Sequence, residues 1–334
     1  MRSTNFMFYG CNSLISLDLS NFNTQNVIYM RDMLSDCNSL VSLNLSNLNI
    51  HNATYMEGMF DCCNSLIALD LSNFNTQKVT NMERMFSDCY LLTSLDLSNF
   101  NTRNVIDMGF MIYDCKSLIS LDISNFNTQN VFNMGFMFDG CNSLVSLDLS
   151  NFITQNTINM WNMFYHCKLL LSLDLSNFNA SKAISMRAMF INCCSLISLD
   201  LSNFNAKNLN DMGFMFCGCK SLLLLNLSNF NAINLKNMES TFYECKSIIS
   251  LDLSSFDTKQ VTNMKATFSH CFSLVSLDLS NFKNKKVKNM VNIFYNCNSL
   301  TLLENSDFNN SNFLFKGDFG NTNSLLYNHK KYDE

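Results

Sequence analysis

Residues 14–37 read LISLDLSNFNTQNVIYMRDMLSDC, and close copies of this stretch fill most of the 334-residue chain. Each copy ends on a cysteine, and these cysteines keep a constant spacing of 26 residues. A fixed period of this length is typical of a solenoid, in which one structural unit is stacked on copies of itself. The cysteines that mark the period are Cys11, Cys37, Cys63, Cys89, Cys115, Cys141, Cys167, Cys193, Cys219, Cys245, Cys271 and Cys297.

The first part of the stretch alternates between apolar and polar residues. Leu17 and Leu19 alternate with Ser16, Asp18 and Ser20. Side chains on a β-strand point to opposite faces in turn, so this pattern predicts a short strand with one buried face. Strands of successive coils would pair in parallel at about 4.8 Å.

The second part of the stretch changes its period. Met30, Met33, Leu34 and Cys37 fall at positions i, i+3, i+4 and i+7, which predicts one face of an α-helix of about two turns. The residue before the first Met is an Asn, Asp or Ser in most copies, and these are the preferred types for a helix N-cap. These residues are Asn81, Asp107, Asn133, Asn159, Ser185, Asp211, Asn237, Asn263 and Asn289.

Neither element would be stable alone, so each coil must stack on its neighbours. We predict an α/β solenoid with one short parallel strand and one short helix per 26-residue coil. Because helices need about 8 to 10 Å of lateral room, more than strands, the stack should curve with the strands concave. The solenoid should cover residues 1–300 in about twelve coils, the first incomplete, and residues 301–334 should form a degenerate closing coil and a polar C-terminal tail.

The repeated cysteines lie at the end of the predicted helix. Helix spacing would hold them beyond the Cα separation of about 4.4 to 6.8 Å that a disulfide needs. We therefore favour buried free thiols that act as small apolar residues, with a disulfide ladder as the alternative. Three further cysteines, Cys62, Cys194 and Cys217, follow no pattern and are interpreted as incidental.

Composition excludes several classes of function. The net charge is −5, so nucleic acid is not an expected partner. No apolar run approaches the roughly 20 residues that a membrane span needs, and the start, MRSTNFMFYG, shows no export signal. No cofactor, metal or catalytic residue is expected, because no nucleophile-base pair, phosphate loop or metal cluster interrupts the repeats.

Stacking turns the polar strand position into a row of side chains: Asp18, Asn44, Asp70, Asp96, Asp122, Asp148, Asp174, Asp200, Asn226, Asp252 and Asp278. The six consecutive carboxylates are our candidate binding strip: Asp70, Asp96, Asp122, Asp148, Asp174 and Asp200. A solvated face that discourages aggregation is the plainer interpretation, with Ser94 and Ser98 hydrogen-bonding Asp96. A binding strip for a cationic or hydroxyl-rich partner is the functional alternative, and a calcium-binding row is the weakest. The Asn row that follows the strand, for example Asn99, is interpreted as turn chemistry, with amides bonding from coil to coil.

The complete frame, LxSLDLSNFNTxNVxNMxxMFxxCxSL, closely resembles the BspA-like leucine-rich repeat of bacterial and protist surface proteins. It extends from about residue 6 to residue 300, and the copy at 68–89 reads ALDLSNFNTQKVTNMERMFSDC. The resemblance implies a leucine-rich-repeat-like solenoid and a role at the cell surface, in adhesion or host contact. It implies no catalytic residues.

The leading hypothesis is a non-enzymatic surface or secreted protein that uses its Asp/Ser-lined strand face to bind a protein or extracellular-matrix ligand. The alternative is an intracellular, cytoplasmic scaffold that binds another protein. The many thiols and the lack of a visible export signal favour this alternative.

Overall fold

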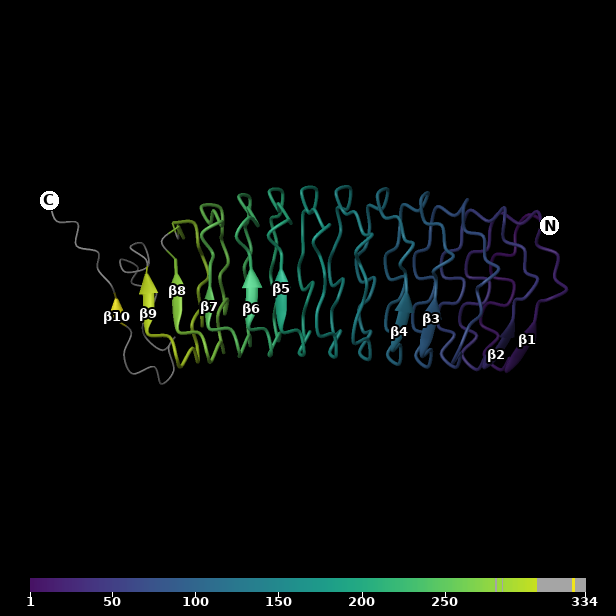
Figure 1. Cartoon of the computed structure of the whole chain (residues 1–334), viewed down its shortest axis with the longest axis horizontal. Coiled ribbons are helices and arrows are strands. Elements are labelled where there is room, and N and C mark those ends of the chain that lie inside the picture. Colours follow the sequence, from purple (N-terminus) through teal and green to yellow (C-terminus); the bar gives the residue numbers. More distant parts are fainter. Residues whose placement is uncertain (280, 284, 305–325, 328–334) are drawn as a thin grey trace. The chain divides into compact units, whose positions relative to one another are not determined.

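The computed structural model describes residues 1–279, 281–283, 285–304 and 326–327. Contacts divide the chain into two compact units, Met1–Phe178 and Asn179–Glu334. Within each unit, successive coils of the chain lie side by side, as Figure 1 shows. The single solenoid over residues 1–300 stays a prediction. Much of the predicted closing coil and tail, residues 305–325 and 328–334, lies outside the described residues.

Most of the short strands lie where the repeat reads SLD or a close variant, although the equivalent residues 68–70, 146–148 and 172–174 have no assigned strand. The strands are β1 (Ser16–Asp18), β2 (Ser42–Asn44), β3 (Ser94–Asp96), β4 (Ser120–Asp122), β5 (Ser198–Asp200), β6 (Leu224–Asn226), β7 (Ser250–Leu251), β8 (Ser276–Asp278), β9 (Leu302–Glu304) and β10 (Leu326–Tyr327). All pairs are parallel: β1 with β2, β3 with β4, β5 with β6, and β7 to β10 in sequence order.

The strand register confirms the repeat of 26 residues. Ser16 lies opposite Ser42, and Asp96 lies opposite Asp122. The backbone of Glu304 lies opposite Asp278, so the last, degenerate copy of the repeat also keeps the register of 26 residues. The chain is therefore a repeat solenoid with short parallel strands, as predicted.

The predicted helix is wrong: the described residues contain no helix. An α-helix requires each N–H to donate to the carbonyl four residues earlier. Instead, the N–H groups of Met30, Asp32 and Leu34 donate to carbonyl oxygens of the next coil at 2.8–3.0 Å. Hydrogen bonds between coils have replaced those of the helix.

Left-handed backbone conformations explain why this segment cannot be helical. Asp32 and Asp36 have φ values of 49° and 59°, and residues 26 positions further on repeat both conformations. Helical residues have negative φ, so two left-handed residues per coil break the segment into consecutive turns. The N–H of Cys37 accordingly donates to the carbonyl of Leu34, three residues earlier, at 3.3 Å.

The polar residues expected to cap the helix cap turns instead. The Oδ1 atoms of Asn81 and Asp107 each accept an N–H from the residue two positions on, at 2.8 Å. The backbones of these residues also form a second row of parallel bridges, Asn81 with Asp107 and Asp107 with Asn133. The prediction that these side chains accept a backbone N–H was correct, but the element that they stabilise is an Asx turn.

The predicted curvature depended on helices packing at a wider spacing than strands. The described coils have no helices and form hydrogen bonds on both the strand side and the turn side. The difference in spacing from which we predicted concave strands is therefore absent within each unit.

The methionine and phenylalanine rows form the core, in agreement with the apolar spacing of the repeat. Met82, Met85 and Phe86 are fully buried. The rings of Phe60 and Phe86 stack at a centroid distance of 5.5 Å, so each core position continues into the next coil. No helix in the described part of the chain has the length and hydropathy needed to cross a bilayer.

The cysteines are free thiols in this structure. Those that mark the repeat are buried, except Cys11, which is exposed. Cys89 Sγ donates to the carbonyl oxygen of Phe60 at 3.2 Å, and the same contact recurs from coil to coil. Helix spacing, on which our preference for thiols depended, is absent, whereas this hydrogen bond gives each thiol a defined place in the core.

Candidate functional site

The candidate binding strip lies on the strand face, and its members divide between the two units. Asp70, Asp96, Asp122, Asp148 and Asp174 belong to Met1–Phe178 and are exposed. We call these five residues the acidic strip. Asp200 is also exposed but belongs to Asn179–Glu334, where it lies opposite Asn226.

A shallow open groove follows part of the acidic strip. Asp70, Asp96, Asp122 and Asp148 line it together with serines and leucines of the same coils, Ser94, Leu95, Ser120 and Leu121 among them. The structure therefore brings four of the predicted residues to one surface that offers carboxylates, hydroxyls and partly buried leucines.

Each carboxylate of the acidic strip accepts a hydrogen bond from the N–H of the serine two positions later. The N–H of Ser98 donates to Oδ1 of Asp96 at 2.9 Å, and Ser124 donates to Asp122 through both its N–H and its hydroxyl, at 3.0 and 2.7 Å. Asn44 accepts the equivalent N–H in its own coil at 3.1 Å. The turn after the strand thus needs an acceptor oxygen at this position but does not need a charge.

At three of these positions the hydrogen bonds favour the ionised form of the carboxylate. The N–H and hydroxyl of Ser72 lower the pKa of Asp70, and those of Ser150 and Ser176 lower the pKa values of Asp148 and Asp174. No ion pair within the described residues involves the acidic strip. Its negative charge is therefore uncompensated by Lys or Arg of the described part of the chain.

An exposed apolar row precedes the strands, and our sequence analysis missed it. In Met1–Phe178 the residue just before the SLD sequence is aliphatic in six coils, with Thr93 in the remaining one. Between 41 and 65% of each aliphatic residue is exposed. We call this row the aliphatic ladder: Ile15, Val41, Ile67, Ile119, Val145 and Leu171.

The repeat carried a signal that could have revealed the aliphatic ladder. We treated the position between Leu14 and Ser16 as variable, yet it holds Ile, Val or Leu in nearly every copy. Asn179–Glu334 repeats the pattern with exposed Ile197, Leu223, Ile249 and Val275. A position that stays apolar in nearly every coil while it is exposed to solvent is not needed for the core, so another role, such as contact with a partner, accounts for it better.

The asparagine row after the strands has the structural role that we predicted. Nδ2 of Asn99 donates to the carbonyl oxygens of Leu71 and Ser72, both at 3.0 Å. Nδ2 of Asn73 makes the equivalent bonds to Leu45 and Ser46. These amides join neighbouring coils and are not available to a ligand without loss of those bonds.

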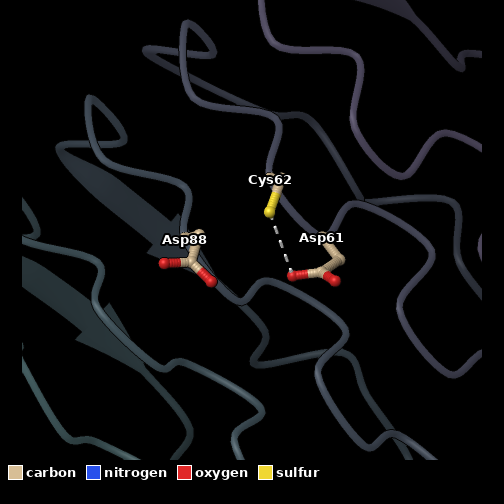
Figure 2. Close-up of side chains that lie close together, drawn as sticks. All are labelled: Asp61, Cys62 and Asp88. Carbon is tan, nitrogen blue, oxygen red and sulfur yellow. Dashed lines mark hydrogen bonds between the residues drawn. The ribbon is translucent and has the colours of Figure 1, made fainter. Parts of the chain in front are cut away.

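Three potential metal ligands lie together on the turn side of the coils. The ligand atoms of Asp61, Cys62 and Asp88 lie within 4.8 Å of one another, and Figure 2 shows that they come from neighbouring coils. Cys62 occupies one of the left-handed positions, with a φ of 57°. Its neighbours in the row, at Asp88 and Asp36, are carboxylates in the same conformation.

The bonds within this cluster do not favour a metal. Arg84 donates to Oδ2 of Asp61 at 2.9 Å, while Ser87 and Tyr90 donate to the two oxygens of Asp88 at 2.7 and 3.0 Å. Burial and the nearby carboxylates raise the pKa of Cys62 to about 12, so the thiol is protonated at neutral pH. A cation would have to displace Arg84 and deprotonate Cys62.

A family model matches the sequence over residues 2–94, 91–199, 116–224, 145–250 and 223–328. Its description is "Mycoplasma protein of unknown function, DUF285". The chain belongs to the DUF285 family. A search of curated protein sequences found no significant relative of this DUF285 chain.

Solved structures of bacterial leucine-rich repeat proteins are similar to the DUF285 chain. A leucine-rich repeat protein from Bacteroides ovatus is 18% identical, with a TM-score of 0.47, over 98% of this chain and 88% of that one. A leucine rich cell surface protein from Faecalibacterium prausnitzii is 16% identical, with a TM-score of 0.44, over 88% of this chain and 83% of that one. Because neither TM-score reaches 0.5, the architecture rests on the coils and strands described above.

Proposed function

We propose that this DUF285 chain is a non-enzymatic binding protein that holds another protein on its strand face. One observation carries the proposal: the acidic strip, with no ion pair among the described residues, runs beside an exposed aliphatic ladder. Exposed apolar rows are typical of interaction surfaces, and a row of like charges beside one selects a partner of opposite charge.

The repetition of the surface supports binding over catalysis. A catalytic site concentrates different groups at one point, whereas the strand face presents the same Ser, Asp and aliphatic positions coil after coil. Among the described residues, the cluster of Asp61, Cys62 and Asp88 departs from this repetition, and internal hydrogen bonds hold its carboxylates. A protein or extracellular-matrix ligand that spans several coils would use the repeated surface best.

The resemblance to BspA-like repeats supports a location at the cell surface or in the secreted fraction. Protease treatment of intact cells tests this location, because a surface protein is cleaved before the cells are lysed. Protection until lysis would instead support the alternative, an intracellular scaffold, which the reduced thiols favour.

Site-specific cross-linking tests the strand face directly. A photoreactive phenylalanine replaces Ser94 or Ser120 on the strand face, and Gln129, an exposed residue of a turn, provides the matched control. The proposal expects covalent protein adducts from the two serine positions and few from position 129. Equal adducts at all three positions, or none from the strand face in intact cells, would overturn it.

A further inference from the structure

The aliphatic ladder of Met1–Phe178 contains an unbroken run next to the acidic strip. Ile119, Val145 and Leu171 are 61, 41 and 47% exposed and belong to consecutive coils. The N–H of Leu171 donates to the carbonyl oxygen of Val145 at 3.1 Å, so equivalent residues of these coils lie side by side and their exposed side chains form one apolar ridge. Exposed apolar ridges of this kind mark contact surfaces.

The acidic strip runs parallel to this ridge at a distance fixed by the chain. Asp122 lies three positions after Ile119 in the sequence, and Asp148 lies three positions after Val145. At about 3.3 Å per residue the two rows lie roughly 10 Å apart. Strand alternation does not set the direction of Ile119, because this residue precedes β4, and both Ile119 and Asp122 are exposed. An α-helix with its side chains is about 10 to 12 Å wide, which is wide enough for one helix lying along the rows to reach both.

The spacing along the rows also suits a helix better than an extended chain. A helix places side chains of one face about 5.4 Å apart, close to the coil spacing of about 4.8 Å. An extended chain places them about 6.6 to 6.8 Å apart and loses register after one coil. Over three coils, only the helix keeps one side chain against each coil.

The negative charge of the acidic strip favours a bound helix with positively charged side chains on its polar face. Hydrogen bonds from Ser150 and Ser176 keep Asp148 and Asp174 ionised, and neither carboxylate has an ion pair in the part of the chain that the structure describes. Lys and Arg side chains would relieve the repulsion between carboxylates of adjacent coils.

We infer that this surface binds a basic amphipathic helix of a partner protein, an assignment that rests on the proposed function. The apolar side of the helix packs on Ile119, Val145 and Leu171. Its Lys and Arg side chains lie over Asp122, Asp148 and Asp174. Recognition of this kind reads an apolar stripe and a charged stripe together.

A set of synthetic peptides provides the probe for the full chain. The test peptide is a stapled 18-residue helix, about 27 Å long, with Leu at i, i+3, i+4 and i+7 and Lys on the adjacent side. One control has the same composition in shuffled order, and a second alternates Leu and Lys so that it favours a strand. Fluorescence anisotropy measures binding at low salt and at about 0.5 M salt.

Two protein variants separate the two rows. The threonine variant carries three changes in the aliphatic ladder: Ile119→Thr, Val145→Thr and Leu171→Thr. Because threonine already occupies this position of the repeat at Thr93, we expect the strand geometry to be kept. The asparagine variant carries three changes in the acidic strip: Asp122→Asn, Asp148→Asn and Asp174→Asn. Asn44 shows that asparagine at this position of the repeat accepts the turn hydrogen bond without a charge. Asp107→Asn, on the turn side where Asn81 and Asn133 flank it, is the matched control.

We expect the helical peptide to bind about tenfold more tightly than the shuffled and alternating peptides. The threonine variant should lose about tenfold in affinity at both salt concentrations, and the asparagine variant should lose affinity mainly at low salt. Equal binding of the alternating peptide, no binding of the helical peptide at roughly 100 μM, or an unchanged threonine variant would overturn the inference. Retained cross-links at Ser94 and Ser120 would then show that the broader proposed function survives.

Discussion

The thiol of Cys115 donates a hydrogen bond to the carbonyl oxygen of Phe86, which lies 29 residues earlier in the preceding coil, at 3.1 Å. Both residues are fully buried. The cysteine row therefore stabilises the stack in two ways, because it fills apolar space and also supplies a donor to a core carbonyl.

Replacing Cys115 with alanine should lower the free energy of unfolding by about 2 kcal/mol, since it opens a small cavity and leaves the Phe86 carbonyl without this donor. Urea unfolding measures the change. Cys217→Ala, at a half-buried cysteine outside the repeated row, should change stability by less than about 0.5 kcal/mol. Equal losses in the two variants would contradict a special role for the row.

Thiol reactivity should follow burial. Burial raises the pKa values of Cys89 and Cys141 well above the ordinary range, so iodoacetamide at pH 8 should modify exposed Cys11 and leave these two thiols unmodified. After unfolding without reductant, all 15 cysteines should become reactive. Mass spectrometry checks both states, and peptides joined through cysteines of the row would support the disulfide alternative.

The turn after β3 should tolerate loss of charge better than loss of an acceptor. Asp96→Asn should keep the bond from Ser98 and leave the unfolding free energy nearly unchanged, whereas Asp96→Ala should lower it by about 1 kcal/mol. Thermal unfolding of the two variants compares them. Similar melting temperatures for both would show that the turn does not depend on this side chain.

Asp139 should make stability depend on pH. Burial, and then the charge of Asp114, raise the pKa of Asp139 from 3.8 to about 7. A carboxyl with a raised pKa in the folded state favours folding below its unfolded pKa and loses that contribution as pH rises through the folded value. Asp139→Asn should therefore raise the melting temperature at pH 8 and change it little near pH 4. An equal shift at both pH values would show that ionisation is not the cause.

Backbone conformation predicts opposite effects for two alanines of one coil. Ala188 has a φ of 59°, which disfavours an L side chain, so Ala188→Gly should be neutral or stabilise the protein by up to about 1 kcal/mol. Ala183 is buried without a left-handed backbone, and Ala183→Gly should destabilise the protein by about 1 kcal/mol. Urea unfolding of the pair tests the assignment, which fails if Ala188→Gly is the more harmful change.

The sequence predicted the period, the strands and the core because each depends on a pattern that one coil repeats in the next. Leu17 and Leu19 alternate with polar residues, and that alternation has one structural meaning. The spacing of Met30, Met33, Leu34 and Cys37 is compatible with two structures. One is a helix, and the other is a series of consecutive turns, which can also direct residues three and four apart toward a core. The left-handed conformations and the hydrogen bonds between coils distinguish the turns from a helix, and non-glycine residues hold most of the left-handed positions, so the sequence does not mark them.

The strand face was predicted in part. The row of carboxylates was evident from Asp70 to Asp200, and their exposure follows from strand alternation. The aliphatic ladder was not evident, because Ile15 directly follows Leu14 in the sequence. Two adjacent aliphatic residues of this kind are ordinarily interpreted as part of a hydrophobic core. Exposure at Ile15 depends on how the chain turns into β1, which no local pattern specifies.

The fixed register has a consequence for how such a chain can change its length. From β1 to β9 the paired strands join equivalent places of the repeat, so gain or loss of one whole coil within a unit leaves the remaining junctions chemically alike. A change in the number of coils would therefore lengthen or shorten the strand face in steps of one coil, with the same chemistry at each step. If this face binds a partner as we propose, the number of coils sets how many equivalent contacts that partner can make.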